Sequence, residues 1–320
     1  MGANPAGFVS IHGKRLGLTP NGLVADGQLV TNPFIGRNKF IYLDSAIGGS
    51  SGGSPFDAVA TLAAALALAV SGDIIVALPG HAENIANSTA VTLSVAGVSV
   101  VGVGNGRLRP TFTFTAANTA TVNVAADKCG FYNCRFAANF LSIAAPFTLA
   151  AAKSFRLDTC SFMDTSSVLD FLNIVKSTGI ANTVDGLAAE DCSWNGLGTT
   201  SVNSFILSAN DIDGVSWLRN KIKLARTADA SILATITAGV ITNADVGDNR
   251  CYSAQTATTA GSLINVGGTT STGFVYRNYV QTLTTSSDKL FTTSVGLAAF
   301  ENRVSGAVGA TGFVIPAVDS

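Results

Sequence analysis

The side chains best suited to chemistry in this sequence are four aspartates in two short stretches. Asp211 and Asp213 stand in "NDIDG", and Asp245 and Asp248 follow roughly one repeat later. If residues 211–213 are extended, period-two alternation places both carboxylates on the same side of the chain. Two carboxyl groups roughly 5 to 10 Å apart are the pair that glycoside hydrolysis requires. Aspartate beside glycine or asparagine is also what tight turns use, and the sequence favours that structural role.

Other reactive groups are few. The chain has two histidines, His12 and His81, each of which we interpret as a surface or capping residue. Most aromatic residues fall at inward positions of the repeat described below, so no external stack for sugar rings is expected. Tyr132, Tyr252 and Tyr279 remain candidates for such a role. The sequence therefore predicts no catalytic, no cofactor-binding and no metal-binding residues.

Three of the five cysteines belong to an internal repeat. "YNCRF" around Cys134 returns as "DTCSF" around Cys160 and "EDCSW" around Cys192. The series continues with asparagine at the same place: Asn220, Asn249, Asn278 and Asn302. In all seven copies the preceding residue is polar, and the residue two positions later is apolar. Period-two alternation points the cysteine or asparagine and the later apolar residue to one face, and the charges to the other.

This repeat predicts the fold. Apolar clusters precede most copies, for example "FLSI" at 140, "FLNI" at 171, "FILS" at 205 and "SLINV" at 262. The repeat unit is short and contains strands without helices. Such a repeat indicates an all-β fold, a right-handed parallel β-helix. Cysteine and asparagine would then form one internal ladder, in which asparagine makes the tight bend because it tolerates the left-handed backbone conformation. A ladder spreads the thiols along a line, which favours packing over a metal or redox cluster.

One helix is expected, over residues 54–72. Ser54 would cap it, Pro55 takes the first position, Asp57 lies in the first turn and Gly72 ends it. Leu62, Leu66 and Ala69 would form its buried stripe. A β-helix needs its first coil covered, so this helix is predicted to be a lid.

The stretch "SPFDAVATLAAALALAVSGDIIVALPGHAENI" resembles the lead-in of right-handed β-helix proteins of the pectate-lyase-like superfamily. Lyases and glycosidases of that superfamily use acidic clusters on one face of the coils, and the lyases use Ca²⁺ with a basic proton acceptor. The earlier stretch "FVSIHGKRLGLTPNGLVADGQLV" resembles the leading segment of phage virion proteins. Residues 1–53 are expected to form an N-terminal arm with lead-in strands, residues 54–305 the lid and β-helix, and the apolar residues 306–320 a C-terminal tail or cap.

Composition completes the prediction. Charged residues make up 12% of the 320 residues, and the net charge is −1, so neither nucleic acid nor an anionic membrane is an expected partner. No stretch is long and apolar enough to span a bilayer, and the N-terminus lacks the pattern of a secretory signal. The sequence and its resemblances predict a non-enzymatic protein of the phage virion, most readily a homotrimeric capsid decoration protein whose partner is the major capsid protein or another virion protein. A tailspike-like adhesin or depolymerase, and a free polysaccharide lyase, are the alternatives.

Overall fold

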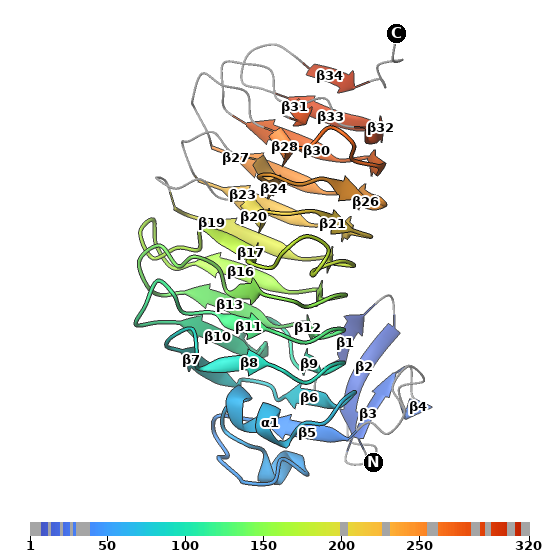
Figure 1. The fold of residues 1–320 in the computed structure, drawn as a ribbon. Helices are drawn as coiled ribbons and strands as arrows, with labels where there is room; N and C mark the ends of the chain where they lie inside the picture. Colours follow the sequence, from blue (N-terminus) through green and yellow to red (C-terminus); the bar gives the residue numbers. More distant parts are fainter. Residues whose placement is uncertain are drawn as a thin grey trace.

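The computed structural model describes residues 39–198, 204–225, 231–254, 262–282, 289–291, 296–305 and 311–314, and the backbone of four short strands between residues 8 and 29. In these parts of the chain almost every regular element is a strand, and most strands belong to three parallel sheets that run the length of the molecule (Figure 1). The prediction of an all-β parallel β-helix is confirmed.

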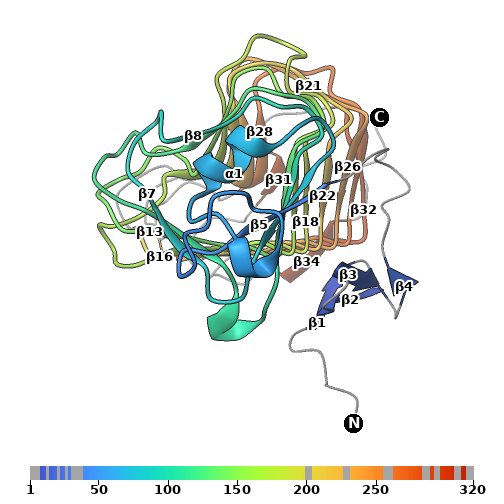
Figure 2. The same cartoon turned by 90° about the horizontal axis from the view of Figure 1, so that it is seen from below.

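Each coil contributes one strand to each sheet in turn, and strands of successive coils pair in parallel. Sheet 1 contains β5 (Phe40–Leu43), β6 (Ile74–Ala77), β9 (Ser99–Gly102), β12 (Gly130–Tyr132), β15 (Arg156–Asp158), β18 (Ala188–Glu190), β22 (Ser216–Leu218), β26 (Ala244–Gly247), β29 (Gly273–Tyr276) and β32 (Ala298–Phe300). Sheet 2 contains β7 (Ala82–Ile85), β10 (Thr111–Phe114), β13 (Arg135–Ala138), β16 (Ser161–Asp164), β19 (Ser193–Gly196), β23 (Lys221–Leu224), β27 (Arg250–Ser253), β30 (Tyr279–Thr282), β33 (Asn302–Ser305) and the antiparallel β34 (Thr311–Val314). Sheet 3 contains β8 (Val91–Leu93), β11 (Val122–Val124), β14 (Phe147–Leu149), β17 (Asn173–Ser177), β20 (Ser204–Ser208), β24 (Ser231–Ile236), β28 (Ser262–Val266) and β31 (Lys289–Phe291). Seen from its N-terminal end in Figure 2, the solenoid encloses one continuous core.

The predicted ladder is confirmed. Six of its seven residues stand one position before a strand of sheet 2, and the seventh, Asn302, is the first residue of β33; the register of the sheet places them in line. All seven are buried: Cys134, Cys160, Cys192, Asn220, Asn249, Asn278 and Asn302. Neighbouring asparagines bond directly, since Asn220 Nδ2 donates to Asn249 Oδ1 at 2.9 Å.

The bend itself lies one residue earlier than predicted. Positive φ angles of 49° to 58° occur at the residue before every ladder position, and not at the ladder residue itself. These seven residues are Asn133, Thr159, Asp191, Arg219, Asp248, Arg277 and Glu301. The asparagine is therefore selected for its buried amide and not for its tolerance of the left-handed conformation, which the preceding residue adopts instead.

The lid is shorter than predicted. Helix α1 spans Leu62–Leu68, and Thr61 caps it by accepting a hydrogen bond from Ala64 N at 3.2 Å. Residues Pro55–Asp57 form a separate 3₁₀ turn, η1, because the chain between the two is extended and Val59 bridges to Leu43. The position of the lid is as expected, since α1 lies against β5 and β8, with Leu62 and Leu66 buried.

Two further details differ from the expected elements. "FLSI" at 140 does not supply the strand of sheet 3 in its coil; only isolated bridges join Leu141 to Leu169 and Ile143 to Phe171, and β14 begins at Phe147. A second 3₁₀ turn, η2, spans Gly106–Leu108, and a small parallel pair joins β21 (Ile212–Asp213) to β25 (Ile241–Thr242). Leu141, in the middle of "FLSI", is exposed and does not point into the core.

The ends of the chain add strands. β1 (Phe8–Ile11), β2 (Lys14–Thr19), β3 (Gly22–Ala25) and β4 (Gln28–Leu29) form an antiparallel sheet, and β5 is the first strand of sheet 1. β34 pairs with β33 at the other end. No helix in the described parts is long and apolar enough to cross a membrane.

Candidate functional site

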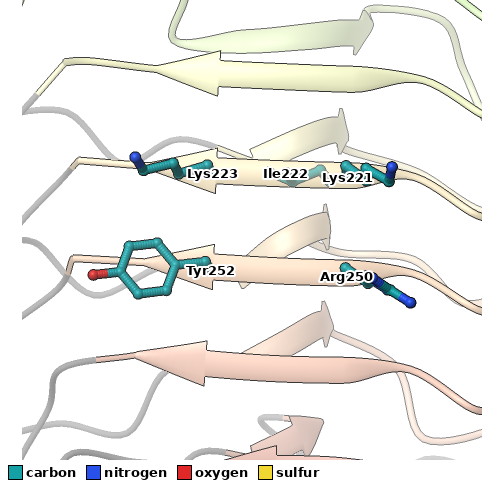
Figure 3. A pocket seen from close by; sticks show the side chains of 5 residues that line it. All are labelled: Lys221, Ile222, Lys223, Arg250 and Tyr252. Atoms are coloured by element: carbon teal, nitrogen blue, oxygen red, sulfur yellow. The ribbon is translucent and has the colours of Figure 1, made fainter.

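A cationic surface lies on the outer side of sheet 2. On β23, Lys221 and Lys223 are exposed, while Ile222 and Leu224 between and after them are buried in the core. On the next strand, β27, Arg250 is exposed and Tyr252 is half-buried. The register pairs Lys221 with Arg250 and Lys223 with Tyr252. We call these four side chains the cationic face; Figure 3 shows them as two pairs on neighbouring strands.

The charges of the cationic face are not neutralised by the described part of the protein. A hollow of about 530 Å³ lies over it, lined by the four side chains and Ile222, and none of the described lining residues is a carboxylate. None of Lys221, Lys223 and Arg250 forms an ion pair with another described residue. Clustered positive charge without counter-charges attracts anions, and the half-buried Tyr252 adds an apolar ring beside the charges.

The arginines of the adjoining corner, where sheets 1 and 2 meet, are different. Arg219 bonds both carboxylate oxygens of Asp191, with Nη2 and Oδ2 2.8 Å apart, and Arg277 holds Asp248 in the same two-pronged way. The pKa of Arg219 is raised, mainly because its guanidinium donates hydrogen bonds to the carboxylate of Asp191. Because these arginines are already paired, the free cations of sheet 2 are the better candidates for binding an external anion.

The structure gives the predicted aspartates structural roles. Asp213 Oδ1 accepts hydrogen bonds from Thr242 Oγ1 at 2.5 Å and Asn243 Nδ2 at 2.7 Å in the next coil, and the pKa of Asp213 is lowered first by the bond from Thr242. Asp211 Oδ1 accepts from the backbone N–H of Val240 at 2.8 Å. A general acid for glycoside hydrolysis needs a raised pKa, whereas the pKa of Asp213 is lowered, and both carboxylates already bond the next coil.

Asp245 and Asp248 lie elsewhere. Asp245 is on the outer side of sheet 1, where it interacts with the hydroxyl group of Tyr276; burial is the main cause that raises the pKa of Tyr276, and this interaction adds to it. Asp248 belongs to the corner and pairs with Arg277. The structure does not bring the four predicted carboxylates together into one site.

His81 is buried, which corrects its interpretation as a surface residue. Its Nδ1 accepts from the backbone N–H of Ser45 at 3.0 Å, and its Nε2 lies 3.3 Å from Glu83 Oε2. The same Glu83 oxygen accepts from the backbone N–H of Leu62 at 2.7 Å, at the start of α1. His81 and Glu83 therefore connect the first coil to the lid. His12 lies outside the described residues.

An exposed aromatic cluster was missed by the sequence prediction. The rings of Tyr276 and Phe300 stack on the outer side of sheet 1, with centroids 5.3 Å apart and planes 8° apart, and Phe274 lies 6.3 Å from Phe300. The expectation of no external aromatic stack is therefore wrong. The sequence contained the information needed to find this cluster. Positions two and four residues before each ladder residue point outward from sheet 1, and the three rings occupy such positions before Asn278 and Asn302. Of the predicted tyrosines, Tyr252 lies on the cationic face, Tyr132 packs on the outer side of sheet 1, and Tyr279 bonds Gln281.

Two buried carboxylates were also missed. Asp164, at the inward end of β16, accepts hydrogen bonds from the backbone N–H groups of Phe171, Leu197 and Gly198. Burial nevertheless raises its pKa to about 6, and the charge of Asp170 adds to that shift. Asp170 is itself buried and accepts from the backbone N–H of Ser142 at 3.1 Å. Both carboxylates fasten loops beside sheet 2, and both are enclosed by protein.

Among the described residues, no three His, Cys, Asp or Glu side chains are grouped so that they could hold a metal ion.

Comparison with known proteins gives fold-level similarity. No protein-family model matches the chain, and no curated sequence matches it significantly. Among solved structures, a rhamnogalacturonan lyase matches over 87% of this chain and 89% of its own, with 12% identity and a TM-score of 0.49. The pectate lyase Pel9A matches over 87% of this chain and 82% of its own, with 12% identity and a TM-score of 0.38.

These matches correct one prediction. Both solved structures are polysaccharide lyases, and they contradict the prediction that this chain is no enzyme. That prediction is withdrawn. At 12% identity the similarity concerns the fold, so the choice of activity for this chain depends on its own residues.

Proposed function

We propose that this protein acts on an acidic polysaccharide, which it binds along the cationic face and cleaves by β-elimination. The observation that carries the proposal is the cationic face itself: three cations unpaired within the described structure, and a tyrosine, on two neighbouring strands with no carboxylate among them. Rigid strands hold the four side chains at fixed spacing, which favours binding to a repeating polymer over binding to a flexible partner.

The residue types suit this reaction. Lys221 and Arg250, which are neighbours in register, would hold the carboxylate of a uronate sugar and stabilise the negative charge that develops on it. The proton on the carbon next to that carboxylate would pass to the lone pair of Lys223 in its neutral amine form, or to the oxygen of Tyr252 in its phenolate form. The electron pair of the broken C–H bond forms a double bond, the C–O bond to the neighbouring sugar breaks, and the departing oxygen takes a proton from water. No oxidant or reductant is needed.

The test measures binding and cleavage with matched variants. Lys221→Gln, Lys223→Gln and Arg250→Gln should each weaken binding of a polyuronate at least about tenfold and abolish release of unsaturated sugars, because each removes one charge from the face. Lys176→Gln is the control, since Lys176 points outward from sheet 3. Binding and cleavage that persist unchanged in all three variants would overturn the proposal.

A tailspike-like depolymerase is the form of this proposal that agrees with the phage-like N-terminal stretch. Binding without cleavage in the same experiment would favour the adhesin alternative instead. The virion location, the homotrimer and a capsid or other virion partner stay predictions from the sequence.

A further inference from the structure

A second hollow lies at the corner between sheets 1 and 2. Its volume is about 240 Å³, and it opens beside the buried thiols of Cys160 and Cys192. Its polar lining comes from four coils, the first of which is separated from the next by the coil of β13: Arg109, Thr159, Asp191, Ser193, Arg219 and Lys221. Lys221 also lines the hollow over the cationic face, so the two hollows adjoin.

One cation of this corner hollow has an unsatisfied donor. The Nε atom of Arg109 is buried and has no hydrogen-bond partner among the described residues. Arg219, in the same hollow, donates through Nε and Nη2 to Asp191 and Glu190. A buried charged donor without an acceptor is unfavourable, so an anion in the hollow, close to the Arg109 guanidinium, would stabilise it.

The charge balance of the hollow also favours an anion. Three cations line it, Arg109, Arg219 and Lys221, against one carboxylate, Asp191, which Arg219 already neutralises. Ser193 adds a hydroxyl donor between them. The net charge that remains belongs to Arg109 and Lys221, one on each side of the hollow, and an oxyanion between them would meet donors from both.

We propose that the corner hollow is an oxyanion site that receives a carboxylate or sulfate group, and that its occupant is a second acidic group of the polymer bound on the cationic face. The identity of the occupant rests on the proposed function; the oxyanion site itself does not. Ser193, Lys221 and Arg250 are paired in consecutive strands, which are about 4.8 Å apart. The two acidic groups are therefore about 5 to 10 Å apart, and the polymer runs along the axis of the solenoid.

The experiment uses the full chain and two probes, inorganic sulfate and an oligogalacturonate, followed by calorimetric titration. Arg109→Gln should raise the Kd for sulfate at least about tenfold and should also weaken binding of the oligosaccharide, because one of the two free charges is lost. Arg107→Gln, an exposed arginine in η2, is the matched control and should change neither. If Arg109→Gln does not fold, Arg109→Lys is the second variant. It keeps the positive charge without the Nε donor and should still weaken the binding of sulfate.

The outcomes separate the two proposals. Unchanged sulfate and oligosaccharide affinity in the Arg109 variants, with weaker oligosaccharide binding in Lys223→Gln, would overturn the corner site and leave the proposed function intact. Weaker sulfate binding in the Arg109 variants, with unchanged oligosaccharide binding in Lys223→Gln, would leave the oxyanion site and overturn its polymer occupant. If sulfate binds the Arg109 variants as tightly as it binds the unaltered protein, the sulfate is an adventitious ion only, and the corner site is overturned.

Discussion

The lower and upper coils of the solenoid fill the same ladder position with different chemistry. In the lower coils, up to Cys192, the ladder residue is a thiol, and the neighbouring core contains stacked rings: Phe136 lies 5.6 Å from Phe112 and 5.2 Å from Phe162. In the upper coils, from Asn220 onward, the ladder residue is an amide, and the aligned core residues are smaller, as at Ile222 and Val280. One backbone geometry therefore supports either an apolar or a polar ladder.

The difference extends to buried charge. Every buried ionisable acid or histidine among the described residues lies at or before residue 190: Asp73, His81, Asp158, Asp164, Asp170 and Glu190. The buried polar side chains of the described upper coils are serine, threonine and asparagine. The lower coils are stabilised mainly by large apolar side chains and tolerate local buried charges, whereas the upper coils depend on a neutral hydrogen-bond network in which each amide completes the next.

The largest expected effect comes from the aromatic stack. Phe136→Ala removes a fully buried ring that contacts four other phenylalanines, so the free energy of unfolding should fall by about 3 to 5 kcal/mol. Phe274→Ala removes a ring of the same size that is 57% exposed and should cost less than about 1 kcal/mol. Urea unfolding measures both, and similar losses in the two variants would contradict the division between core and surface.

The amide ladder comes next. Asn249→Leu leaves the N–H and the amide of Asn220 without their acceptor, and the carbonyl of Trp217 without its donor. Because these groups stay buried, stability should fall by about 3 kcal/mol. Asn195→Leu, on the exposed side of β19, is the control and should change stability little. A neutral Asn249→Leu would show that the upper coils do not depend on the ladder.

The pH dependence should distinguish the two halves. The pKa of Asp164 is raised to about 6 in the folded protein from an ordinary 3.8, so the folded state binds this proton more tightly than the unfolded state does. The corresponding stability is fully present below about pH 4 and is lost as the pH rises through about 6, an effect of the order of 3 kcal/mol. Hydrogen exchange should therefore accelerate with pH in the lower coils, after correction for the intrinsic exchange rate. Asp164→Asn should abolish that dependence, and an unchanged dependence in this variant would assign it to another group.

A smaller effect tests the boundary between the ladders. Cys192→Asn should be tolerated, because Asn220 Oδ1 already accepts from the backbone at position 192 and a new amide can join it. Cys134→Asn should cost about 1 to 2 kcal/mol more, because Pro110 holds the preceding rung and has no N–H to donate to the new oxygen. Thermal unfolding compares the two variants, and equal costs would mean that ladder neighbours do not matter.

The sequence predicted the elements whose signal repeats. The ladder and the strands of sheet 2 were predictable because seven copies obey one alternation, and the same rule could have located Phe274, Tyr276 and Phe300 on the outside of sheet 1. The lid was predictable in place but not in length, because the extended pairing of Val59 with Leu43 overrides the helical preference of residues 55–61. Asp211 and Asp213 were interpreted as turn residues; in the structure both bond the next coil, and Asp213 lies in the short strand β21.

The sequence by itself determined which residues point inward and which point outward, because strand alternation is a local property of the backbone. Only the tertiary structure decided which outward residues become neighbours. Lys221 and Arg250 are 29 positions apart in the chain and adjacent on sheet 2, while Asp248, two positions before Arg250, turns to the corner and binds Arg277. Coil lengths that vary from copy to copy set that register, and with it the separation of free from neutralised charge. The cationic face, the unsatisfied Arg109 and the buried Asp164 all arise from contacts between coils, which no single repeat contains.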